Sequence, residues 1–362
     1  MVTGRQLPQA AACGVFLLLA ACQSMPAPVA CLPCPACTAP AGAAAPAAGA
    51  AALGPGRAAA LAPAPAAGGP SDAAPAATPP SPGEAGAAPA LHIALALGGG
   101  AARGFAHVGV IKALLAHGVH PDIVVGTSVG SFVAALYAAG YDAEQLQQVA
   151  HQFEESSIKD WALPSRGVLK GTALQDFINR KVEGRAIEDL PRKLAIVATD
   201  LQSGDMMVFE RGNVGLAVRA SSSVPGLFRP VAIGTHEYVD GGLVSPVPVR
   251  VARRLGADVV IAVDISERPA DQSTAGELDI VLQTFAIMGR VIAREELDSA
   301  DIVLTPELSG VGSTDFSARE AAIRSGERAV EGELPRISAF LQQAQQKAAR
   351  NAAVIANPPA NP

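Results

Sequence analysis

Four short apolar runs, separated by stretches of helical character, constrain the fold of this chain more than any other feature. They are LHIALAL (91–97), IVV (123–125), KLAIVATD (193–200) and DVVIAVDI (258–265). Near-continuous aliphatic runs of this length are typical of strands buried on both faces, and helices between them indicate parallel crossovers. We therefore predict an α/β three-layer sandwich with a mostly parallel central sheet. One domain at about 91–345 has an ordinary length for such a fold.

The segments between and after these runs predict the remaining elements. Residues 105–118 and 128–139 have helical patterns, and 206–210 and 237–240 are expected to form shorter strands. The last helix is predicted from Ser317 to about Arg350, with a break near Gly332 to Pro335, because glycine and proline disfavour helix interiors. We expect residues 346–362 to form a disordered tail.

The first 90 residues have a different composition. Arg5 precedes a short apolar stretch at 10–21, which is too short to span a bilayer and is typical of a signal peptide. The stretch ends in Leu-Ala-Ala-Cys, which resembles a bacterial lipobox and predicts lipidation of Cys22 after removal of 1–21. The alternative is an ordinary signal peptide with a coincidental cysteine. Residues 22–90, mostly Ala, Pro and Gly after the cysteines, are expected to form a disordered tether.

The residues after Cys22 suggest a location. Gln23 stands where an aspartate retains many Gram-negative lipoproteins at the inner membrane, so we expect a lipoprotein of the cell envelope, facing the periplasm from the outer membrane. Cys31, Cys34 and Cys37 have zinc-like spacing, but no fourth ligand lies nearby and prolines separate them. We interpret them as part of the tether. No cysteine follows, so the predicted domain has neither a disulfide nor a thiol nucleophile.

The stretch VGTSVGS (125–131) lies between a predicted strand and a predicted helix. Strand, Gly-x-Ser-x-Gly, helix is the pattern of a nucleophile elbow, in which Gly126 and Gly130 give room to a tight turn. Ser128 would then lie at a helix N-terminus, beside amides and a partial positive charge. The motif alone is equally compatible with a turn in which Ser128 only caps the helix.

A nucleophilic serine needs a base. A Ser-His-Asp triad remains possible in chain order through Asp200 and His236, whereas His151 lies in a polar helix; both histidines look like surface residues. Asp240 offers another base, since it ends a predicted strand before two glycines. A carboxylate can serve when burial raises its pKa. The alternative for Asp-Gly-Gly is a structural turn.

The glycine-rich turn LGGGAARG (97–104) follows the first strand. Its backbone can approach a ligand closely and direct amides at a negative oxygen. Nucleotide binding is the competing interpretation, but the Lys-Ser/Thr of a P-loop and the last glycine of G-x-G-x-x-G are both missing. An oxyanion hole fits better. The formal net charge of −6 gives no indication of nucleic-acid binding.

Taken together, these motifs resemble the bacterial patatin-like phospholipase family, in the branch related to neuropathy target esterase. The resemblance runs from Leu91 to about Glu267 through six blocks in order: ALGGGAARGFAHVGVI, GTSVGS, ATDLQSG, AVRASSSVPGLFRPV, YVDGGLVSPVPV and ARRLGADVVIAVDIS. It implies Ser128 as nucleophile and Asp240 as base. It also implies the supporting residues: Gly99, Gly100 and Ala101 in the oxyanion hole, Arg103 and Gly104 beside it, Gly126 and Gly130 at the elbow, and Gly241 and Gly242 in the base loop. Ala101 departs from the family, which commonly has glycine there.

The resemblance implies hydrolysis of fatty-acyl esters of membrane lipids by a Ser-Asp dyad, without metal or cofactor. An inactive lipoprotein that binds lipid or a partner, and an acyltransferase of the same fold, are the alternatives. The serines of ASSSVP (220–225) could be a rival nucleophile, but no elbow surrounds them, and we interpret them as loop support. Trp161 and Leu163 could line the mouth of the site, although packing of Trp161 between cap and sheet is the favoured reading.

Overall fold

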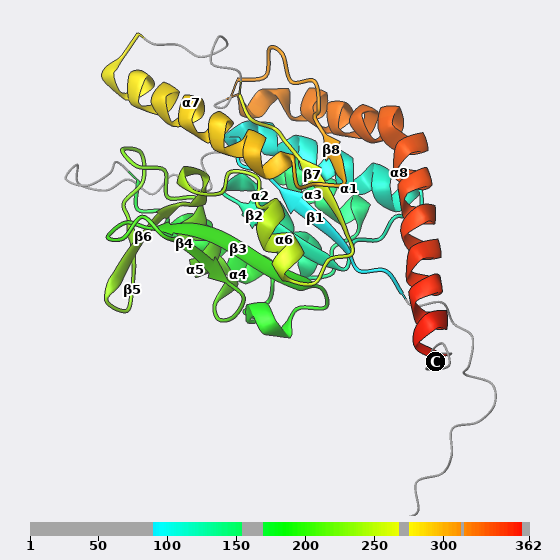
Figure 1. Cartoon of the computed structure of the whole chain (residues 1–362). Helices are drawn as coiled ribbons and strands as arrows, with labels where there is room; N and C mark the ends of the chain where they lie inside the picture. Colours follow the sequence, from blue (N-terminus) through cyan, green and yellow to red (C-terminus); the bar gives the residue numbers. More distant parts are fainter. Residues whose placement is uncertain (1–89, 154–168, 268–274, 313–314, 357–362) are drawn as a thin grey trace, which may run out of the picture. The chain divides into compact units, whose positions relative to one another are not determined.

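The computed structural model describes residues 90–153, 169–267, 275–312 and 315–356 of the 362-residue chain (Figure 1). Within these ranges eight strands form one sheet. They are β1 (Ile93–Leu97), β2 (Ile123–Thr127), β3 (Lys193–Asp200), β4 (Met206–Phe209), β5 (Val231–Ile233), β6 (His236–Asp240), β7 (Val259–Val263) and β8 (Ile302–Leu304). Hydrogen-bonded neighbours follow the order β5-β6-β3-β2-β1-β7-β8, and β4 also pairs with β3. Strands β1, β2, β3, β7 and β8 are parallel, whereas β4 and β6 are antiparallel to β3.

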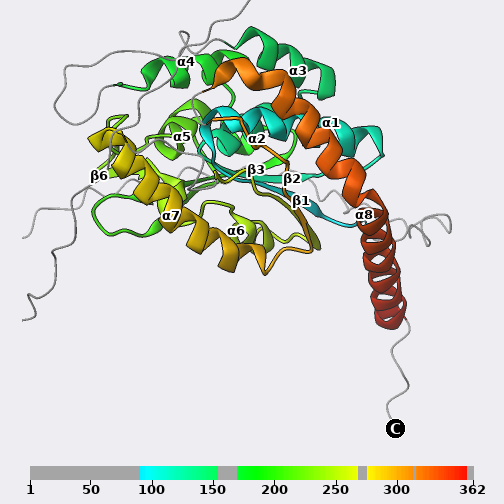
Figure 2. The ribbon, with the colours of Figure 1, turned by 90° about the horizontal axis from the view of Figure 1, so that it is seen from above.

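The helices cover both faces of this sheet. They are α1 (Phe105–Ala116), α2 (Val129–Ala138), α3 (Ala143–Gln152), α4 (Thr172–Lys181), α5 (Val214–Ser221), α6 (Val249–Arg254), α7 (Glu277–Leu297) and α8 (Arg319–Ala356). Figure 2 shows α6 and α7 on one face of the sheet and the other helices on the opposite face, which confirms the predicted three-layer α/β fold. No helix in the described ranges is both long and apolar enough to cross a bilayer.

Strand β1 shows why the sheet is buried on both sides. Leu95 and Leu97 belong to the larger apolar cluster, with α1, α2 and α8. Ala94 and Ala96 belong to the smaller cluster, which contains Val249, Val251 and Ala252 of α6 and Ala293 of α7. All four strand residues have no exposed surface. Because side chains alternate along a strand, the leucines of β1 face the layer formed by α1, α2 and α8, and its alanines face the layer formed by α6 and α7.

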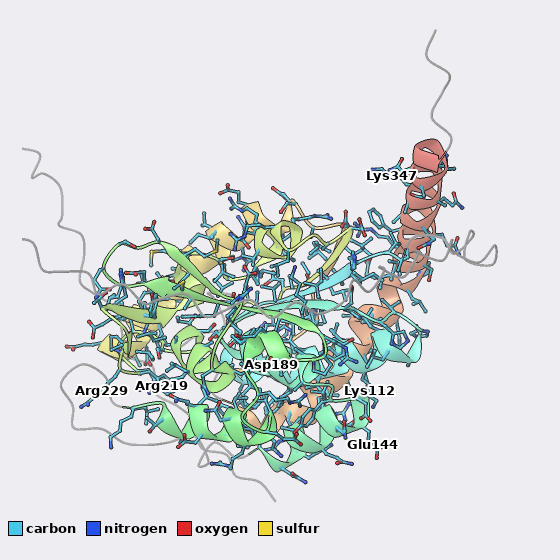
Figure 3. The ribbon with its side chains drawn as sticks, turned by 90° about the horizontal axis from the view of Figure 1, so that it is seen from below. Lys112, Glu144, Asp189, Arg219, Arg229 and Lys347 are labelled. Carbon is cyan, nitrogen blue, oxygen red and sulfur yellow. The ribbon has the colours of Figure 1, made fainter. Side chains whose placement is uncertain are left out.

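The C-terminal helix corrects one sequence prediction. Instead of a break near Gly332 to Pro335 and a tail from residue 346, α8 continues through Pro335 to Ala356 and bends partway along its length (Figure 1). Val330 and Ile337 on the two sides of Pro335 are fully buried, so packing holds the helix together across the proline. Lys112 of α1, labelled in Figure 3, adds an ion pair with Glu327 of α8 at 2.8 Å.

Two strands meet end to end along one edge of β3, and this arrangement positions the site. Ile196 and Val197 pair with β2 and β4, whereas Ala198 and Thr199 pair with β4 and β6. Where the pairing of β3 with β2 ends, β6 takes over as the neighbour on the same side of β3, and it runs antiparallel to β3. The ends of the two strands, Thr127 and Asp240, pair with the consecutive residues Val197 and Ala198.

Candidate active site

Ser128 occupies a sharp turn between β2 and α2. Its φ of 54° and ψ of −127° lie in a region that residues other than glycine rarely adopt. A Cβ on Gly130 would lie 2.1 Å from the Leu97 carbonyl oxygen, and one on Gly126 would lie 2.5 Å from the Gly130 carbonyl oxygen. Gly130 therefore allows the turn to pass close to β1, and Gly126 allows the turn to fold back against its own strand. The backbone has the geometry of a nucleophile elbow, and a simple capped turn does not require it.

The Ser128 hydroxyl donates a hydrogen bond to the Asp240 carboxylate. Ser128 Oγ and Asp240 Oδ2 are 2.6 Å apart, although 112 residues separate them in the chain. The end-to-end meeting of β2 and β6 accounts for this approach. Gly241 tightens the junction, since a Cβ there would lie 2.3 Å from the Val197 carbonyl oxygen and 3.2 Å from Thr127 Cγ2. The structure thus brings together the two residues that the sequence proposed as nucleophile and base.

Asp240 is buried, with 7% of its surface exposed. Its Oδ1 atom accepts a bond from the Gly242 amide at 2.7 Å, so each carboxylate oxygen has a partner. Its backbone is held by the Thr199 hydroxyl, which donates to the Asp240 carbonyl oxygen at 2.8 Å. Burial raises the pKa of Asp240 to about 6, against the lowering effect of the bonds from Ser128 and Gly242. A carboxylate with this pKa can accept a proton near neutral pH and release it again.

Ser221, at the end of α5, supports the elbow. Its Oγ accepts a hydrogen bond from the Ser128 amide at 2.8 Å and donates one to the Val197 carbonyl oxygen at 2.5 Å. Nearby, the Asp240 amide donates to the Ser223 carbonyl oxygen at 3.0 Å. The ASSSVP segment therefore holds the backbone of both reacting residues. This geometry agrees with the loop-support interpretation of these serines.

The glycine-rich loop lies against Ser128. A Cβ on Gly99 would be 3.2 Å from Ser128 Cβ. The Gly99 amide, predicted as an oxyanion donor, instead donates to the Pro246 carbonyl oxygen at 3.0 Å. The amides of Gly100 and Ala101 have no partner in the backbone hydrogen bonds of the described ranges. Ala101 has a φ of 49°, so the loop keeps a left-handed residue where the family commonly has glycine. Gly100 and Ala101 are the remaining candidate donors for an oxyanion.

Three residues at or just after the end of the glycine-rich loop hold it in place. Arg103 is buried, and its Nη2 donates to the Ser266 carbonyl oxygen at 3.1 Å. A Cβ on Gly104 would lie 2.3 Å from Val129 Cγ2, so Gly104 permits close packing against the start of α2. His107, which has no exposed surface, bonds the Gly98 carbonyl oxygen through Nε2 at 2.8 Å. Because burial lowers the pKa of His107 to about 4, its ring is neutral at physiological pH and Nε2–H is the donor.

Sequence reasoning missed the carboxylate of Glu296, on α7. Glu296 Oε1 accepts a bond from the Ser245 hydroxyl at 2.8 Å, and Oε2 accepts one from the Val249 amide at 3.2 Å. The Ser245 carbonyl oxygen in turn accepts a bond from the Thr127 hydroxyl at 2.8 Å. Burial raises the pKa of Glu296, and the bond from Ser245 opposes this. An acidic residue in a long helix usually faces solvent, so nothing in the sequence marked this position.

The structure does not assemble the histidine triad that the chain order left possible. His236 Nδ1 lies 2.5 Å from Asp200 Oδ2, and its side chain is half exposed at the start of β6. His151 is at the end of α3, beside Glu320 of α8. The Ser128 hydroxyl bonds Asp240 instead of either histidine ring.

The predictions for Cys22, for the other N-terminal cysteines, and for Trp161 and Leu163 lie outside the described residues. Within the described ranges no cluster of three or more His, Cys, Asp or Glu side chains has the arrangement of a metal site.

Fold and site together define an α/β protein in which a partly buried serine on a nucleophile elbow bonds a buried carboxylate. Residues 95–253 match the family of patatin-like phospholipases. Ser128 and Asp240, the two candidate reacting residues, both lie within the matched segment.

Proteins of known name are also similar to part of this chain. Patatin-like phospholipase domain-containing protein 6 of mouse is 38% identical over 194 residues, which are 51% of this chain and 14% of that protein. An uncharacterised NTE family protein of Mycobacterium bovis is 33% identical over 197 residues, 53% of this chain and 54% of its own. The chain thus spans about half, or much less, of the length of these relatives.

Among solved structures, VipD from Legionella pneumophila is similar to this chain with a TM-score of 0.48 and 14% identity, covering 69% of this chain and 68% of VipD. The type III effector protein ExoU is similar with a TM-score of 0.40 and 15% identity, covering 71% of this chain and 54% of ExoU.

Proposed function

We propose that this protein is a serine acyl hydrolase that cleaves fatty-acyl esters of phospholipids and lysophospholipids. The observation that carries the proposal is the 2.6 Å hydrogen bond from Ser128 Oγ to the buried Asp240 carboxylate, on a backbone turn with positive φ. The lipid substrate class is taken from the family match and from the names of the relatives.

In the first half of the reaction Ser128 Oγ attacks the ester carbonyl carbon and passes its proton to Asp240 Oδ2. The carbonyl oxygen becomes negative and accepts hydrogen bonds from the Gly100 and Ala101 amides, with the α2 N-terminus adding a favourable field. The C–O bond to the alcohol then breaks, and the leaving oxygen takes the proton from Asp240. The products of this half are an acyl ester on Ser128 and a free alcohol.

In the second half a water molecule attacks the acyl ester and gives a proton to Asp240. The tetrahedral intermediate collapses, the Ser128 oxygen leaves and recovers the proton, and the fatty acid is released. Apart from Ser128 itself, Asp240 alone has to exchange protons in this scheme, so a histidine is not required. A pKa of about 6 suits a group that must act as base and acid in turn.

Two other functions use the same fold. A binding protein without turnover would not need the strained elbow or a buried acid that shares the serine proton. An acyltransferase would carry out the same first half and give the acyl group to an alcohol other than water. Products formed in the presence of glycerol or lysophospholipid, compared with those formed in buffer alone, distinguish transfer from hydrolysis.

The decisive experiment is active-site labelling combined with turnover. Fluorophosphonate should label the protein, and the protein should release fatty acid from phospholipid and from short p-nitrophenyl esters. Ser128→Ala should abolish labelling and lower the rate by several orders of magnitude. Ser222→Ala, which removes a hydroxyl from the neighbouring ASSSVP segment, is the matched control and should keep both. Wild-type turnover in Ser128→Ala would contradict the proposal.

The location of the protein is a second part of the proposal. Lipidation of Cys22 would anchor the domain to the periplasmic face of the outer membrane, with residues 22–90 as a tether. Mass spectrometry of the mature protein should find a diacylglyceryl group on an N-terminal Cys22. An unprocessed Met1, or cleavage at another residue, would contradict it.

A further inference from the structure

The consecutive residues Ser245 and Pro246 bond three loops of the candidate active site. The Ser245 amide donates to the carbonyl oxygen of Gly241, the residue after the base, at 2.9 Å. The Ser245 carbonyl oxygen accepts a bond at 2.8 Å from the hydroxyl of Thr127, the residue before the nucleophile. The Pro246 carbonyl oxygen accepts the bond from the Gly99 amide of the glycine-rich loop at 3.0 Å. A shift of the 245–246 segment would therefore move parts of all three loops together.

Glu296 of α7 holds the 245–246 segment in place. Its Oε1 atom accepts the bond from the Ser245 hydroxyl at 2.8 Å, and its Oε2 atom accepts one from the Val249 amide at 3.2 Å. Glu296 and Ser245 are 3 and 0% exposed, so water does not compete for these bonds. Arg250 Nε lies 3.7 Å from Oε1 and offsets part of the negative charge. One buried carboxylate thus holds the segment at two points.

A carboxylate is an unfavourable group with which to attach a helix to a loop. Burial of a charge costs free energy even when the charge is paired, and apolar residues of similar size often stabilise a protein more. What the carboxylate adds is direction, since its bonds to Ser245 and Val249 have preferred lengths and angles. Pro246 and Pro248 lie between these two contacts and each fix one φ angle, so the segment has little freedom of its own. The arrangement is therefore suited to aligning the loops more than to stabilising the domain.

We propose that Glu296 is a positioning residue of the acyl hydrolase reaction. Through Ser245 it sets the alignment of the elbow, the base loop and the glycine-rich loop. The inference rests on the proposed function, because it concerns the rate of that reaction. The match to the family ends at residue 253 and assigns Glu296 no role. Since a misplacement of about 1 Å can lower a rate about 100-fold, loss of the bond should lower kcat more than it weakens substrate binding.

The test compares three variants of the full chain, Glu296→Ala, Ser245→Ala and Glu296→Gln, under conditions in which urea denaturation shows each to be folded. Glu296→Ala and Ser245→Ala should lower kcat for short soluble p-nitrophenyl esters about 10- to 100-fold and leave KM within about threefold. Fluorophosphonate labelling of Ser128 should slow by a similar factor, because it needs the same alignment. Glu296→Gln should keep kcat within about threefold, since its amide group can accept from Val249 and donate to Ser245.

Two controls separate positioning from stability. Ile337→Ala on α8 truncates a fully buried side chain, so it should lower the denaturant midpoint and leave kcat unchanged. Glu295→Ala, next to Glu296 but with 77% of its side chain exposed, should keep both. The double variant Ser245→Ala/Glu296→Ala should be no more than about threefold slower than the slower single variant, because both changes break the same bond. If Glu296→Ala does not fold, Ser245→Ala carries the comparison, since it removes that bond with a smaller loss of volume.

The outcomes distinguish this inference from the proposed function. Wild-type kcat in folded Glu296→Ala and Ser245→Ala proteins would overturn the inference and leave the hydrolase standing. So would a kcat in Glu296→Gln as low as in Glu296→Ala, a loss of kcat in Ile337→Ala of the same size, or multiplied losses in the double variant. A wild-type chain that is neither labelled nor active would overturn the proposed function and this inference with it.

Discussion

The Ser221 hydroxyl accepts a hydrogen bond from the Ser128 amide and donates one to the Val197 carbonyl oxygen. It therefore bridges the elbow and β3 at the point where β2 ends. The strained backbone at Ser128 depends on such surroundings, since a positive φ costs about 1–3 kcal/mol and persists only when neighbouring contacts hold it.

We expect Ser221→Ala to impair the elbow without removing the nucleophile. The Ser128 amide and the Val197 carbonyl oxygen would both lose a buried partner, at a cost of about 1–3 kcal/mol in the free energy of unfolding. The rate of fluorophosphonate labelling at Ser128 should fall with it. Urea denaturation and labelling kinetics measure the two effects. Ser222→Ala is the control, and equal behaviour of the two variants would show that Ser221 has no special role.

The activity should depend on the ionisation of Asp240. Only the carboxylate can accept the Ser128 proton, and burial raises the pKa of Asp240 to about 6. The rate of soluble-ester hydrolysis should therefore fall as pH decreases through about 6, with a single titration. A pH–rate profile at saturating and at low substrate measures this. A profile that stays flat down to pH 4.5 would contradict Asp240 as the base.

The stability should depend on Asp240 in the opposite direction. Its folded-state pKa of about 6 is above the ordinary 3.8, so the stability it provides is complete below about pH 3.8 and is lost as pH rises through about 6. Asp240→Asn removes this loss and should be more stable than wild type at pH 8, by up to about 3 kcal/mol. The difference should shrink towards pH 4. Denaturant midpoints of both proteins at several pH values measure it, and a constant difference would argue against a buried, titrating carboxylate.

The sequence predicted the central strands and the elbow well, because long apolar runs and the Gly-x-Ser-x-Gly motif are local signals. The long apolar run of β3 has the predicted bounds, Lys193–Asp200, and the elbow lies between strand and helix as expected. Strands β5 and β8 have three residues each, which is too short for a periodic signal. The meeting of Ser128 with Asp240 is a long-range contact, and residue patterns along the chain do not encode it.

The supporting network was the less predictable part of the site. Glu296 gives no signal in the sequence, because its burial depends on how α7 crosses the loop at Ser245. The prediction for the Gly99 amide failed for a similar reason, since its partner is the Pro246 carbonyl oxygen, nearly 150 residues later in the chain. Pro335 shows the reverse case, where a strong local signal for a helix end was overridden by tertiary packing.

Glu296→Ala should destabilise the domain by about 3 kcal/mol. The Ser245 hydroxyl and the Val249 amide, both buried, would lose their acceptor. Glu296→Gln should cost less, because its amide group can still bond both sites and no buried charge remains. The neighbour Glu295, with 77% of its side chain exposed, gives the control: Glu295→Ala should lie within about 0.5 kcal/mol of wild type. Thermal or urea unfolding measures all three variants, and similar losses for Glu295→Ala and Glu296→Ala would contradict the assignment.

The glycines of the chain should divide sharply in their response to alanine. In Gly130→Ala the new methyl group would lie 2.1 Å from the Leu97 carbonyl oxygen. Because this neighbour is a backbone atom and not a flexible side chain, the clash can be removed only if the elbow or β1 moves. We expect a loss of at least about 3 kcal/mol, together with loss of Ser128 labelling. Gly332→Ala on α8 is the matched control, since nothing lies within 4 Å of the added carbon and the residue is inside a helix. That change should stabilise the protein by about 0.5–1 kcal/mol and leave labelling unchanged. Denaturant midpoints and fluorophosphonate labelling of both variants give the comparison, and a Gly130→Ala protein with wild-type stability and labelling would show that the close approach of the elbow to β1 is not required.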